Sequence, residues 1–367
     1  MIELLVFLGV AAGVGAPRFD VEPVTNAEFR AFVVAHPEWR RDRVPRLFAD
    51  ADYLAHWSGP TTLGPRARSR APVVRVSWFA ARAYCTARGG RLPTEAEWDL
   101  AAGDSADDLA WFARPTPDVL PDVSGKVDAH GVADLHGLVW EWVEDFGSAL
   151  IGTDAQQACG AEAIAAKDPR AYATFMRNAF RNSLEAHYTT TSLGFRCAYD
   201  AAATPPAPSP RPKVESLYDL GVHLRDAAGR DVGLDVLRGH PVLVAMFYTS
   251  CPATCPILID DIARLLAEAK QPDARVLLIS FDPEHDTPAR LAELARARRL
   301  DARWELAAAS AYDARTIAAV LGIKYTQVAS GSFVHGYTVV ALDGDGHLRA
   351  RSLRAGDHGA LVQALAH

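Results

Sequence analysis

The fold of the C-terminal half is decided by residues 241–256, PVLVAMFYTSCPATCP. This stretch begins with a continuous apolar strand, Pro241 to Phe247, and ends in two cysteines just before an amphipathic helix over Ile257 to Lys270. A short apolar run bounded by turn residues is typical of a strand that is buried on both faces. The cysteines therefore follow a buried strand and open a helix, which places them at the carboxyl edge of a sheet, where α/β proteins form ligand sites.

The same alternation continues toward the end of the chain. A second buried strand spans Arg275 to Phe281, a second helix spans Pro288 to Leu300, and a third strand, Tyr337 to Leu342, precedes a turn at residues 343–346 (DGDG). Strands that alternate with helices predict βαβ units. We therefore expect an α/β domain with a mainly parallel sheet that is covered on both faces.

Two thiols and one later histidine indicate a soft-metal site. Cys251 and Cys255 are four positions apart at a helix start, where the helix dipole favours thiolate, and such a pair either closes as a disulfide or chelates a soft metal, with Cu(I) foremost. A thioredoxin-type oxidoreductase normally has C-x-x-C faced by a cis-proline before a later strand. Here the spacing is C-x-x-x-C, and His335, in SFVHG, stands where that proline would lie. Two thiolates and one imidazole suit copper in either oxidation state, whereas zinc usually takes a fourth ligand.

The half from about Ser216 to the end resembles the Sco family (Sco1/SenC) of copper-binding thioredoxin-fold proteins. The matching stretches occur in order as FYTSCPATCP, LISFDPEHDTPARL, LGIKY, GSFVHG and LDGDG. The resemblance implies a thioredoxin-like fold in which Cys251, Cys255 and His335 bind copper. It also implies an exported, membrane-facing or periplasmic protein that helps to assemble copper centres, such as the dinuclear site of cytochrome oxidase.

Three polar residues of the second matching stretch have less specific expectations. Asp282, in the S-x-D-P element, is as readily a structural carboxylate as a functional one. For His285 and Asp286 beside it, a loop salt bridge or a cap is expected.

The first half of the chain is rich in Trp, Gly and irregular polar turns. Its few helical stretches include Asn26 to Ala35 after a capping Thr25, and Phe79 to Arg88 after Ser77. Trp and Glu residues in such a strand-poor domain predict polar groups that are satisfied inside an irregular core.

This half, over about residues 18–200, resembles the formylglycine-generating enzyme (sulfatase-modifying factor) family. The stretches that carry the resemblance are PVTNAEF, PVVRVSW, RLPTEAEW, VWEW and GFRCA. It implies a compact, irregular α+β fold. The family's enzymes oxidise a sulfatase cysteine with a cysteine pair shortly before GFRCA, but here residues 175–183 read FMRNAFRNS, and no cysteine lies between Cys159 and Cys197. We therefore expect no formylglycine generation, as in the NirV-like members that accompany copper nitrite reductase.

This second resemblance also bears on calcium and on the remaining cysteines. Asp128 matches an aspartate of a calcium site in the family, but Leu138 stands in place of an asparagine ligand and removes one oxygen donor, so one calcium site is the most that we expect. Cys85 and Cys197 occupy positions that the family can join by a disulfide. Cys159 is then left unpaired, either as a buried free thiol or as a third sulfur for metal transfer.

The chain length and a proline-rich stretch predict the domain organisation. At about 150 residues per domain, 367 residues predict two or three domains. Ala201 to Pro212 holds five prolines in twelve residues, which is typical of an extended spacer. We expect a signal peptide over 1–17, domains over 18–200 and 216–367, and a linker over 201–215. The apolar run at residues 4–16 is too short to span a bilayer, but no Lys or Arg precedes it, so a buried opening strand is the alternative.

Charge and motifs together lead to one functional hypothesis and two competitors. A net charge of −7 provides no broad field for nucleic acid or anionic lipid. We expect a periplasmic, membrane-proximal copper metallochaperone that delivers copper to a cuproenzyme client of cytochrome oxidase or copper nitrite reductase type, with the N-terminal domain recognising the client. The first competitor is a thiol–disulfide oxidoreductase that reduces the client's copper-ligand cysteines with Cys251 and Cys255. The second is an enzyme with altered chemistry in an N-terminal cleft, for which the sequence shows no nucleophile.

Overall fold

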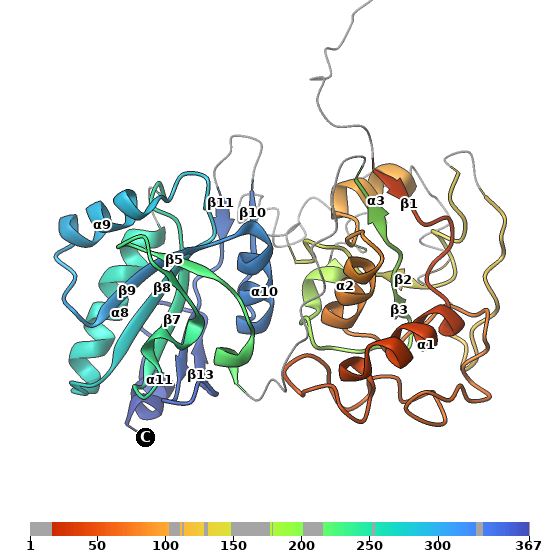
Figure 1. Ribbon diagram of the computed structural model, residues 1–367, viewed down its shortest axis with the longest axis horizontal. Coiled ribbons are helices and arrows are strands. Elements are labelled where there is room, and N and C mark those ends of the chain that lie inside the picture. The colour runs from red at the N-terminus through yellow and green to blue at the C-terminus, as the bar shows by residue number, and fades with distance from the viewer. Residues whose placement is uncertain are drawn as a thin grey trace, which may run out of the picture.

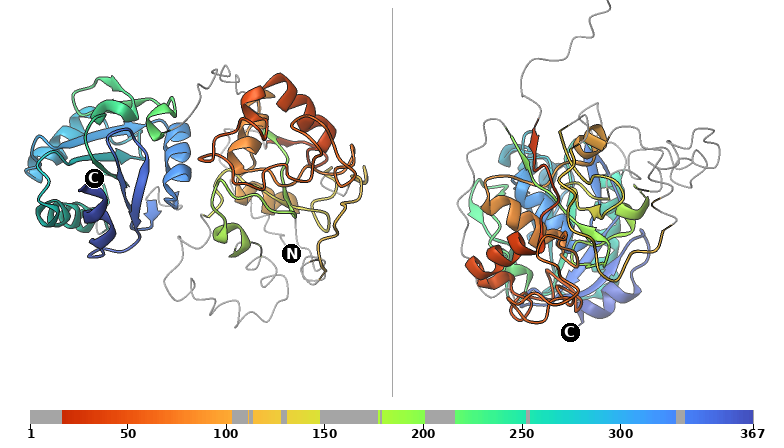
Figure 2. Two further views of the ribbon diagram at one scale, coloured as in Figure 1. Left: turned by 90° about the horizontal axis from the view of Figure 1, so that it is seen from below. Right: turned by 90° about the vertical axis from the view of Figure 1, so that its right-hand side faces the viewer.

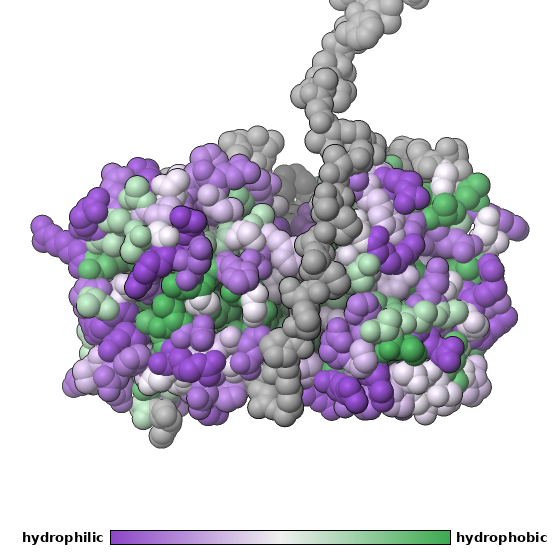
Figure 3. All heavy atoms as spheres, viewed as in Figure 1, coloured by the Kyte–Doolittle hydropathy of each residue, from purple (hydrophilic) through white to green (hydrophobic). Residues whose placement is uncertain are grey.

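Two domains lie side by side in the computed structural model (Figure 1). The described residues are 17–102, 111, 114–127, 131–147, 177, 179–200, 216–251, 254–327 and 333–366. The predicted linker, Asp128, Cys159 and all but the last residue of the predicted signal peptide lie outside them. None of the described helices combines the length and apolarity that crossing a membrane requires. Figure 3 shows hydrophilic residues spread over the visible face of both domains, with smaller hydrophobic areas between them.

The C-terminal domain is built on a seven-stranded sheet in the order β13-β12-β7-β8-β9-β5-β6. The strands are β5 (Leu224–Asp226), β6 (Asp231–Val232), β7 (Val242–Phe247), β8 (Arg275–Ser280), β9 (Trp304–Ala309), β12 (Val339–Leu342) and β13 (Leu348–Ser352). Strands β7, β8 and β9 pair in parallel at its centre. Every residue of β7 is buried, so both faces of the sheet are covered there, as its continuous apolar sequence predicts.

Four helices, two short 3₁₀ turns and a separate two-stranded ribbon complete this domain. They are α8 (Thr254–Ala269), α9 (Pro288–Ala297), α10 (Ala311–Leu321), α11 (Gly359–Leu365), η2 (Leu217–Asp219), η3 (Leu234–Leu237), β10 (Tyr325–Gln327) and β11 (Phe333–His335). Helices α8 and α11 pack against each other, while α9 and α10 pack against β9. The result is the expected α/β thioredoxin-like domain.

The expectation of a mainly parallel sheet is wrong outside the three central strands. Strand β12 runs antiparallel to both β7 and β13, and β5 runs antiparallel to both β9 and β6. Strands joined by a tight turn can only pair antiparallel, because a parallel neighbour needs a crossover of a dozen or more residues. The turn between β12 and β13 is such a connection, in which a carboxylate oxygen of Asp343 accepts hydrogen bonds from the amides of Asp345 and His347 at 3.0 and 2.9 Å.

The N-terminal domain has the irregular α+β fold that the sequence predicts. Its elements are β1 (Arg18–Phe19), α1 (Asn26–Ala35), η1 (Pro37–Trp39), α2 (Trp78–Ala87), α3 (Glu95–Ala102), β2 (Trp140–Glu141), β3 (Leu193–Gly194) and β4 (Ala198–Tyr199). Helix α1 has the predicted bounds because Thr25 and Glu28 form a capping box. Helix α2 begins one residue earlier than predicted, and the Ser77 side chain caps it.

A buried ion pair holds this irregular core together. The carboxylate of Glu141, which is fully buried, accepts hydrogen bonds from the Trp98 indole at 2.7 Å and from the Arg196 guanidinium at 2.8 Å. The same guanidinium also donates to the carbonyls of Val21 and Ala133, each at 2.9 Å. The hydrogen bonds of Trp98 and Glu141 confirm the prediction that Trp and Glu residues are satisfied inside the core. Arg196 also joins its own segment to those that hold Val21, Ala133 and Glu141.

The predicted disulfide between Cys85 and Cys197 is also present, with their Cα atoms 5.4 Å apart. It joins α2 to the residue just before β4, and both cysteines are fully buried. A cross-link across 112 residues restricts the unfolded chain strongly and stabilises the folded domain.

Helices α2 and α10 bring the two domains into direct contact. Figures 1 and 2 agree in placing α10 on the side of the C-terminal domain that faces the N-terminal domain. The guanidinium of Arg82, from α2, lies 3.7 Å from the centre of the Tyr312 ring and donates to the Thr316 hydroxyl at 2.6 Å. Its own domain supplies Glu144 as a partner at 2.7 Å. Two further polar contacts cross the interface, from Arg351 to Glu185 at 3.2 Å and from Lys324 to the carbonyl of Asn182.

Candidate metal centre

The two thiols and the histidine singled out in the sequence meet in the C-terminal domain. One ligand atom from each of Cys251, Cys255 and His335 lies within 4.8 Å of the other two. The Sγ atom of Cys255 is 3.4 Å from Nε2 of His335. Within the described ranges, these three form the one group of three or more His, Cys, Asp or Glu side chains with such spacing.

The end of β7 and the start of α8 position the two sulfurs. Cys251 lies in the connection before the helix, and Cys255 lies in the helix's first turn. The backbone amide of Cys255 donates to the Sγ atom of Cys251 at 3.3 Å. The first sulfur therefore takes the position of a capping side chain, accepting one of the amide hydrogens that a helix start leaves without a partner.

His335 reaches the thiols from the ribbon of β10 and β11, in which it pairs with Tyr325. It is buried, with 8% of its surface exposed, and burial lowers the pKa of its imidazole. Its Nδ1 atom lies 3.1 Å from the carbonyl oxygen of Gly336. A proton on Nδ1 donates to that carbonyl, so Nε2 keeps its lone pair toward Cys255, which is the tautomer that a metal ligand needs.

The expected thiolate is wrong for one of the two cysteines. Burial raises the pKa of the Cys255 thiol, because only 4% of this residue is exposed and a buried thiolate loses its hydration. The neighbouring Cys251 acts in the same direction. Cys255 therefore favours its protonated form, and a metal ion that binds there displaces the proton.

Aromatic rings enclose the histidine side of this group. The His335 ring centre is 5.4 Å from that of Phe281 and 6.1 Å from that of Tyr248. The Tyr248 hydroxyl donates to the carbonyl of Phe333 at 2.9 Å, which ties the start of the cysteine loop to β11. Such an apolar shell limits water access to the group.

The segment around the S-x-D-P element makes a long-range contact that the local sequence does not reveal. His285 forms the expected loop salt bridge, with Asp282 at 2.9 Å. The buried Asp286 instead accepts hydrogen bonds from the backbone amide and hydroxyl of Thr249, 37 residues earlier in the chain. It therefore anchors the cysteine loop, a role that the local motif alone could not indicate.

In the N-terminal domain, two arginines lie in the 175–183 stretch, which has no cysteine. The guanidinium groups of Arg177 and Arg181 lie 5.0 and 4.5 Å from the Trp98 ring centre. Arg181 pairs with Glu95 at 3.4 Å. The calcium expectation rests on Asp128, outside the described residues, and the described part of this domain contains no candidate metal group.

Comparison with known families matches almost the whole chain in two pieces. The family described as sulfatase-modifying factor enzyme 1-like domain matches residues 18–201. The SCO1/SenC family matches residues 215–367.

Individual relatives each cover about half of the chain or less. The formylglycine-generating enzyme of Streptomyces coelicolor is 31% identical over 252 residues, covering 51% of this chain and 79% of that protein. The inactive C-alpha-formylglycine-generating enzyme 2 of Bos taurus is 29% identical and covers 51% of this chain and 78% of that protein. Among solved structures, Arabidopsis thaliana ScoI with copper bound is 18% identical, with a TM-score of 0.36, and covers 40% of this chain and 96% of that one.

Proposed function

Because the chain belongs to the sulfatase-modifying factor family through residues 18–201 and to the SCO1/SenC family through residues 215–367, we propose that it is a two-domain copper metallochaperone. Its C-terminal domain carries one copper ion on Cys251, Cys255 and His335 and delivers it to a cuproenzyme of cytochrome oxidase or copper nitrite reductase type. Its N-terminal domain recognises that client.

The observation that carries this proposal is the donor set. Two sulfurs and one neutral imidazole nitrogen within 4.8 Å, with no carboxylate among them, match the ligand preference of Cu(I). Zinc in a structural site normally takes four protein ligands, one more than this group supplies. The SCO1/SenC family match supports the same metal, since a protein of this family from Arabidopsis thaliana has been solved with copper bound.

Unequal exposure of the three ligands fits a metal that must be handed on. Cys255 and His335 are buried, whereas Cys251 is partly exposed. A client thiolate can therefore replace Cys251 at the copper first, while the two buried ligands still hold the ion. Binding releases the Cys255 proton, so loading is favoured as the pH rises.

We also propose that the protein works in the periplasm. The Cys85–Cys197 disulfide supports this location, because structural disulfides persist in oxidising compartments. Fractionation of cells that express the full chain checks it, and recovery with the cytoplasmic fraction would contradict it.

The alternative function, thiol–disulfide oxidoreductase, is favoured by one observation. The two sulfurs lie within 4.8 Å of each other, which suits a reversible disulfide. In that case His335 is dispensable, because disulfide exchange needs only the thiols.

A Cu(I) titration of the reduced full-length protein against a strong competing chelator tests the proposal. We expect one tightly bound copper, its loss in Cys251→Ser, and a fall in affinity of tenfold or more in His335→Ala, whose disulfide reduction survives. The exposed His223→Ala variant is the matched control and should bind as the wild type does. Failure of the wild type to compete with the chelator would remove the metallochaperone proposal. Unchanged affinity in His335→Ala would remove that residue from the ligand set.

A further inference from the structure

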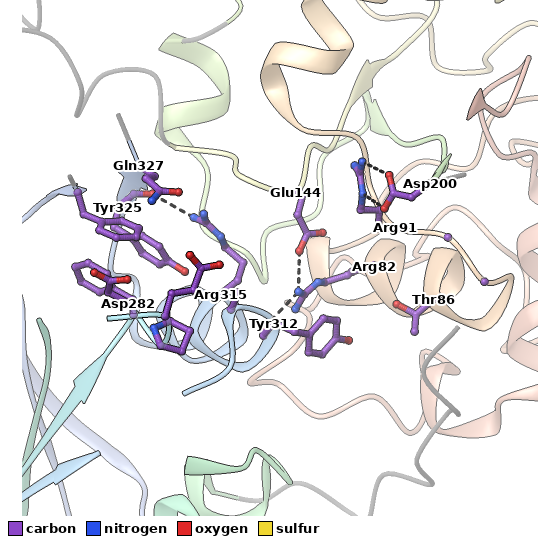
Figure 4. Close-up of a pocket in the computed structure, with 17 residues that line it drawn as sticks. Arg82, Thr86, Arg91, Glu144, Asp200, Asp282, Tyr312, Arg315, Tyr325 and Gln327 are labelled. Carbon is purple, nitrogen blue, oxygen red and sulfur yellow. Dashed lines mark hydrogen bonds and ion pairs between the residues drawn. The ribbon is translucent and has the colours of Figure 1, made fainter. Parts of the chain in front are cut away.

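The three proposed copper ligands come from two parts of the C-terminal domain that are far apart in the sequence. Cys251 and Cys255 are brought together within five residues, at the start of α8, whereas His335 ends β11 on a separate two-stranded ribbon. The cleft between the two domains, which Figure 4 shows at close range, does not set their spacing, since none of the three is among the described residues that line it. The place of His335 beside the thiols is therefore set within the C-terminal domain.

The chain that leaves His335 is held mainly by hydrogen bonds. Gly336 is exposed, and a Cβ atom there would meet no atom within 4 Å. Its backbone amide donates to the carbonyl of Lys324 at 3.2 Å. The next residue, Tyr337, is partly buried, and its hydroxyl donates to a carboxylate oxygen of Asp261 at 2.5 Å. This hydrogen bond joins the chain two residues after His335 to α8.

Asp261 is a fully buried residue of α8, six positions after Cys255. Besides the Tyr337 hydroxyl, its carboxylate accepts hydrogen bonds from the backbone amide of Gly356 at 3.2 Å and from the Arg264 guanidinium at 2.8 Å. One side chain of α8 therefore holds both the segment that leads into β12 and the turn that precedes α11.

The partners of Asp261 favour its ionised form. Nε2 of His358 lies 3.1 Å from Asp261 and Nδ1 lies 2.8 Å from Glu268, so the imidazolium, which donates from both nitrogens, fits between the two carboxylates. Burial alone would raise the pKa of the Asp261 carboxyl, but hydrogen bonds from Tyr337, His358 and Gly356 outweigh it, and this pKa lies below its ordinary value. A hydroxyl bonds more strongly to an ionised carboxylate than to a neutral acceptor.

We propose that Asp261 is a positioning residue of the metal centre, which acts through the Tyr337 hydroxyl to hold the imidazole of His335 against Cys255. This inference rests on the proposed function. Nε2 of His335 is 3.4 Å from Sγ of Cys255, so the fold brings these two ligand atoms together and a metal ion has less conformational freedom to remove when it binds.

Removal of one hydroxyl tests the inference. Tyr337→Phe keeps the aromatic ring and deletes the hydrogen bond to Asp261, whereas removal of the carboxylate itself would leave several buried donors without an acceptor. We expect the Cu(I) affinity of the reduced full-length protein, measured against a competing chelator, to fall about tenfold, with a wild-type circular dichroism spectrum. Tyr188→Phe, at an exposed position in the N-terminal domain, is the matched control and should bind Cu(I) as the wild type does.

A double-mutant cycle with His335→Ala separates positioning from a general structural effect. In His335→Ala the Tyr337 hydroxyl has no imidazole to position, so the further change Tyr337→Phe should alter the Cu(I) affinity by less than about twofold. An effect transmitted through α8 to the thiols would persist in this background, because both thiols are still present.

The remaining outcomes each overturn a defined statement. Wild-type Cu(I) affinity in Tyr337→Phe would overturn the inference and leave the proposed function intact. A loss of affinity that persists in the His335→Ala background, or that comes with a changed circular dichroism spectrum, would also overturn it, since the hydroxyl would then act on the thiols or on the fold. If the wild-type protein fails to compete with the chelator, the proposed function itself fails and the inference fails with it.

Discussion

The carboxylate of Asp286 accepts a hydrogen bond from the backbone amide of Thr249 at 2.9 Å and another from the Thr249 hydroxyl. It also accepts one from the Ser280 hydroxyl at 2.5 Å, at the end of β8. Thr249 is two residues before Cys251, so this buried carboxylate links the loop that presents the partly exposed Cys251 thiol to the centre of the sheet. The position of one candidate ligand thus depends on a residue 35 positions further along the chain.

Asp286→Asn should weaken Cu(I) binding by roughly 10- to 100-fold, the usual effect of losing a contact that orients a metal ligand. Asparagine keeps one acceptor oxygen but loses the negative charge and places an amide donor where the other oxygen accepted, so at least one hydrogen bond from Thr249 or Ser280 is lost or reversed and the anchor of the cysteine loop is weakened. Chelator competition measures the change, and circular dichroism checks the fold. The exposed Asp273→Asn variant is the control. Wild-type affinity in a folded Asp286→Asn protein would contradict the anchoring role.

Arg82→Met should separate the unfolding of the two domains. The substitution keeps an apolar stem but removes the charge that contacts Glu144 and the Tyr312 ring. Leaving a partly buried carboxylate without its partner should lower the free energy of unfolding by roughly 3 kcal/mol. Differential scanning calorimetry of the full chain should resolve two transitions, or broaden one. The exposed Arg290→Met variant should leave the thermogram unchanged, and an unchanged thermogram for Arg82→Met would show that the contact does not couple the domains.

Loss of the Cys85–Cys197 disulfide should destabilise the N-terminal domain while leaving the metal centre intact. The double variant Cys85→Ser, Cys197→Ser should lose about 2–5 kcal/mol of unfolding free energy, because its unfolded chain is no longer restricted across 112 residues. Urea unfolding followed by tryptophan fluorescence measures this change, and the Cu(I) titration should be unaffected. Equal urea midpoints for variant and wild type would show that the cross-link adds no stability.

Stability should also fall in mild acid because of His56. Burial, with further effects from Arg75 and Arg41, lowers the pKa of this imidazole to about 4 in the folded protein. In the unfolded chain the imidazole takes up its proton near pH 6.5, so between about pH 6.5 and pH 4 the unfolded state binds more protons. The full contribution of His56 is therefore present above about pH 6.5 and is lost as the pH falls to about 4, a change on the order of 3 kcal/mol.

Urea unfolding at pH 7, 5.5 and 4.5 checks this contribution. His56→Gln cannot take up that proton, so its stability should fall less steeply with decreasing pH than that of the wild type. The exposed His223→Gln variant should follow the wild-type slope. Identical slopes for His56→Gln and wild type would assign the acid sensitivity to other groups.

Local signals account for the elements that the sequence predicted well. The apolar run of β7, bounded by turn residues, was typical of a buried strand, and the capping Thr25 marked the start of α1 to the residue. The antiparallel edges were harder, because βαβ alternation describes only β7, β8 and β9. Tight turns account for the pairing of β13 with β12 and of β6 with β5, but β12 and β5 pair antiparallel with β7 and β9, which are distant in the sequence.

The sequence indicated which residues form the candidate metal centre, but it did not indicate the protonation state of Cys255. A strand, a turn and a helix placed Cys251 and Cys255 together from nearby residues alone, and His335 was indicated because it stands where a related fold has a proline. The raised pKa of Cys255 depends on burial, and the surroundings of the metal centre include Phe281 and β11, which are remote in sequence.

The sequence by itself determined the division into two kinds of domain and the donor atoms available to a soft metal, because these depend on residue type and local spacing. The pairing of Cys85 with Cys197 was implied by the family resemblance. Only the tertiary structure decided that Asp286 anchors the cysteine loop and that Arg82 joins the domains. The physical reason is that hydration, charge and close contact at each of these sites come from side chains that the folded chain brings together from distant positions.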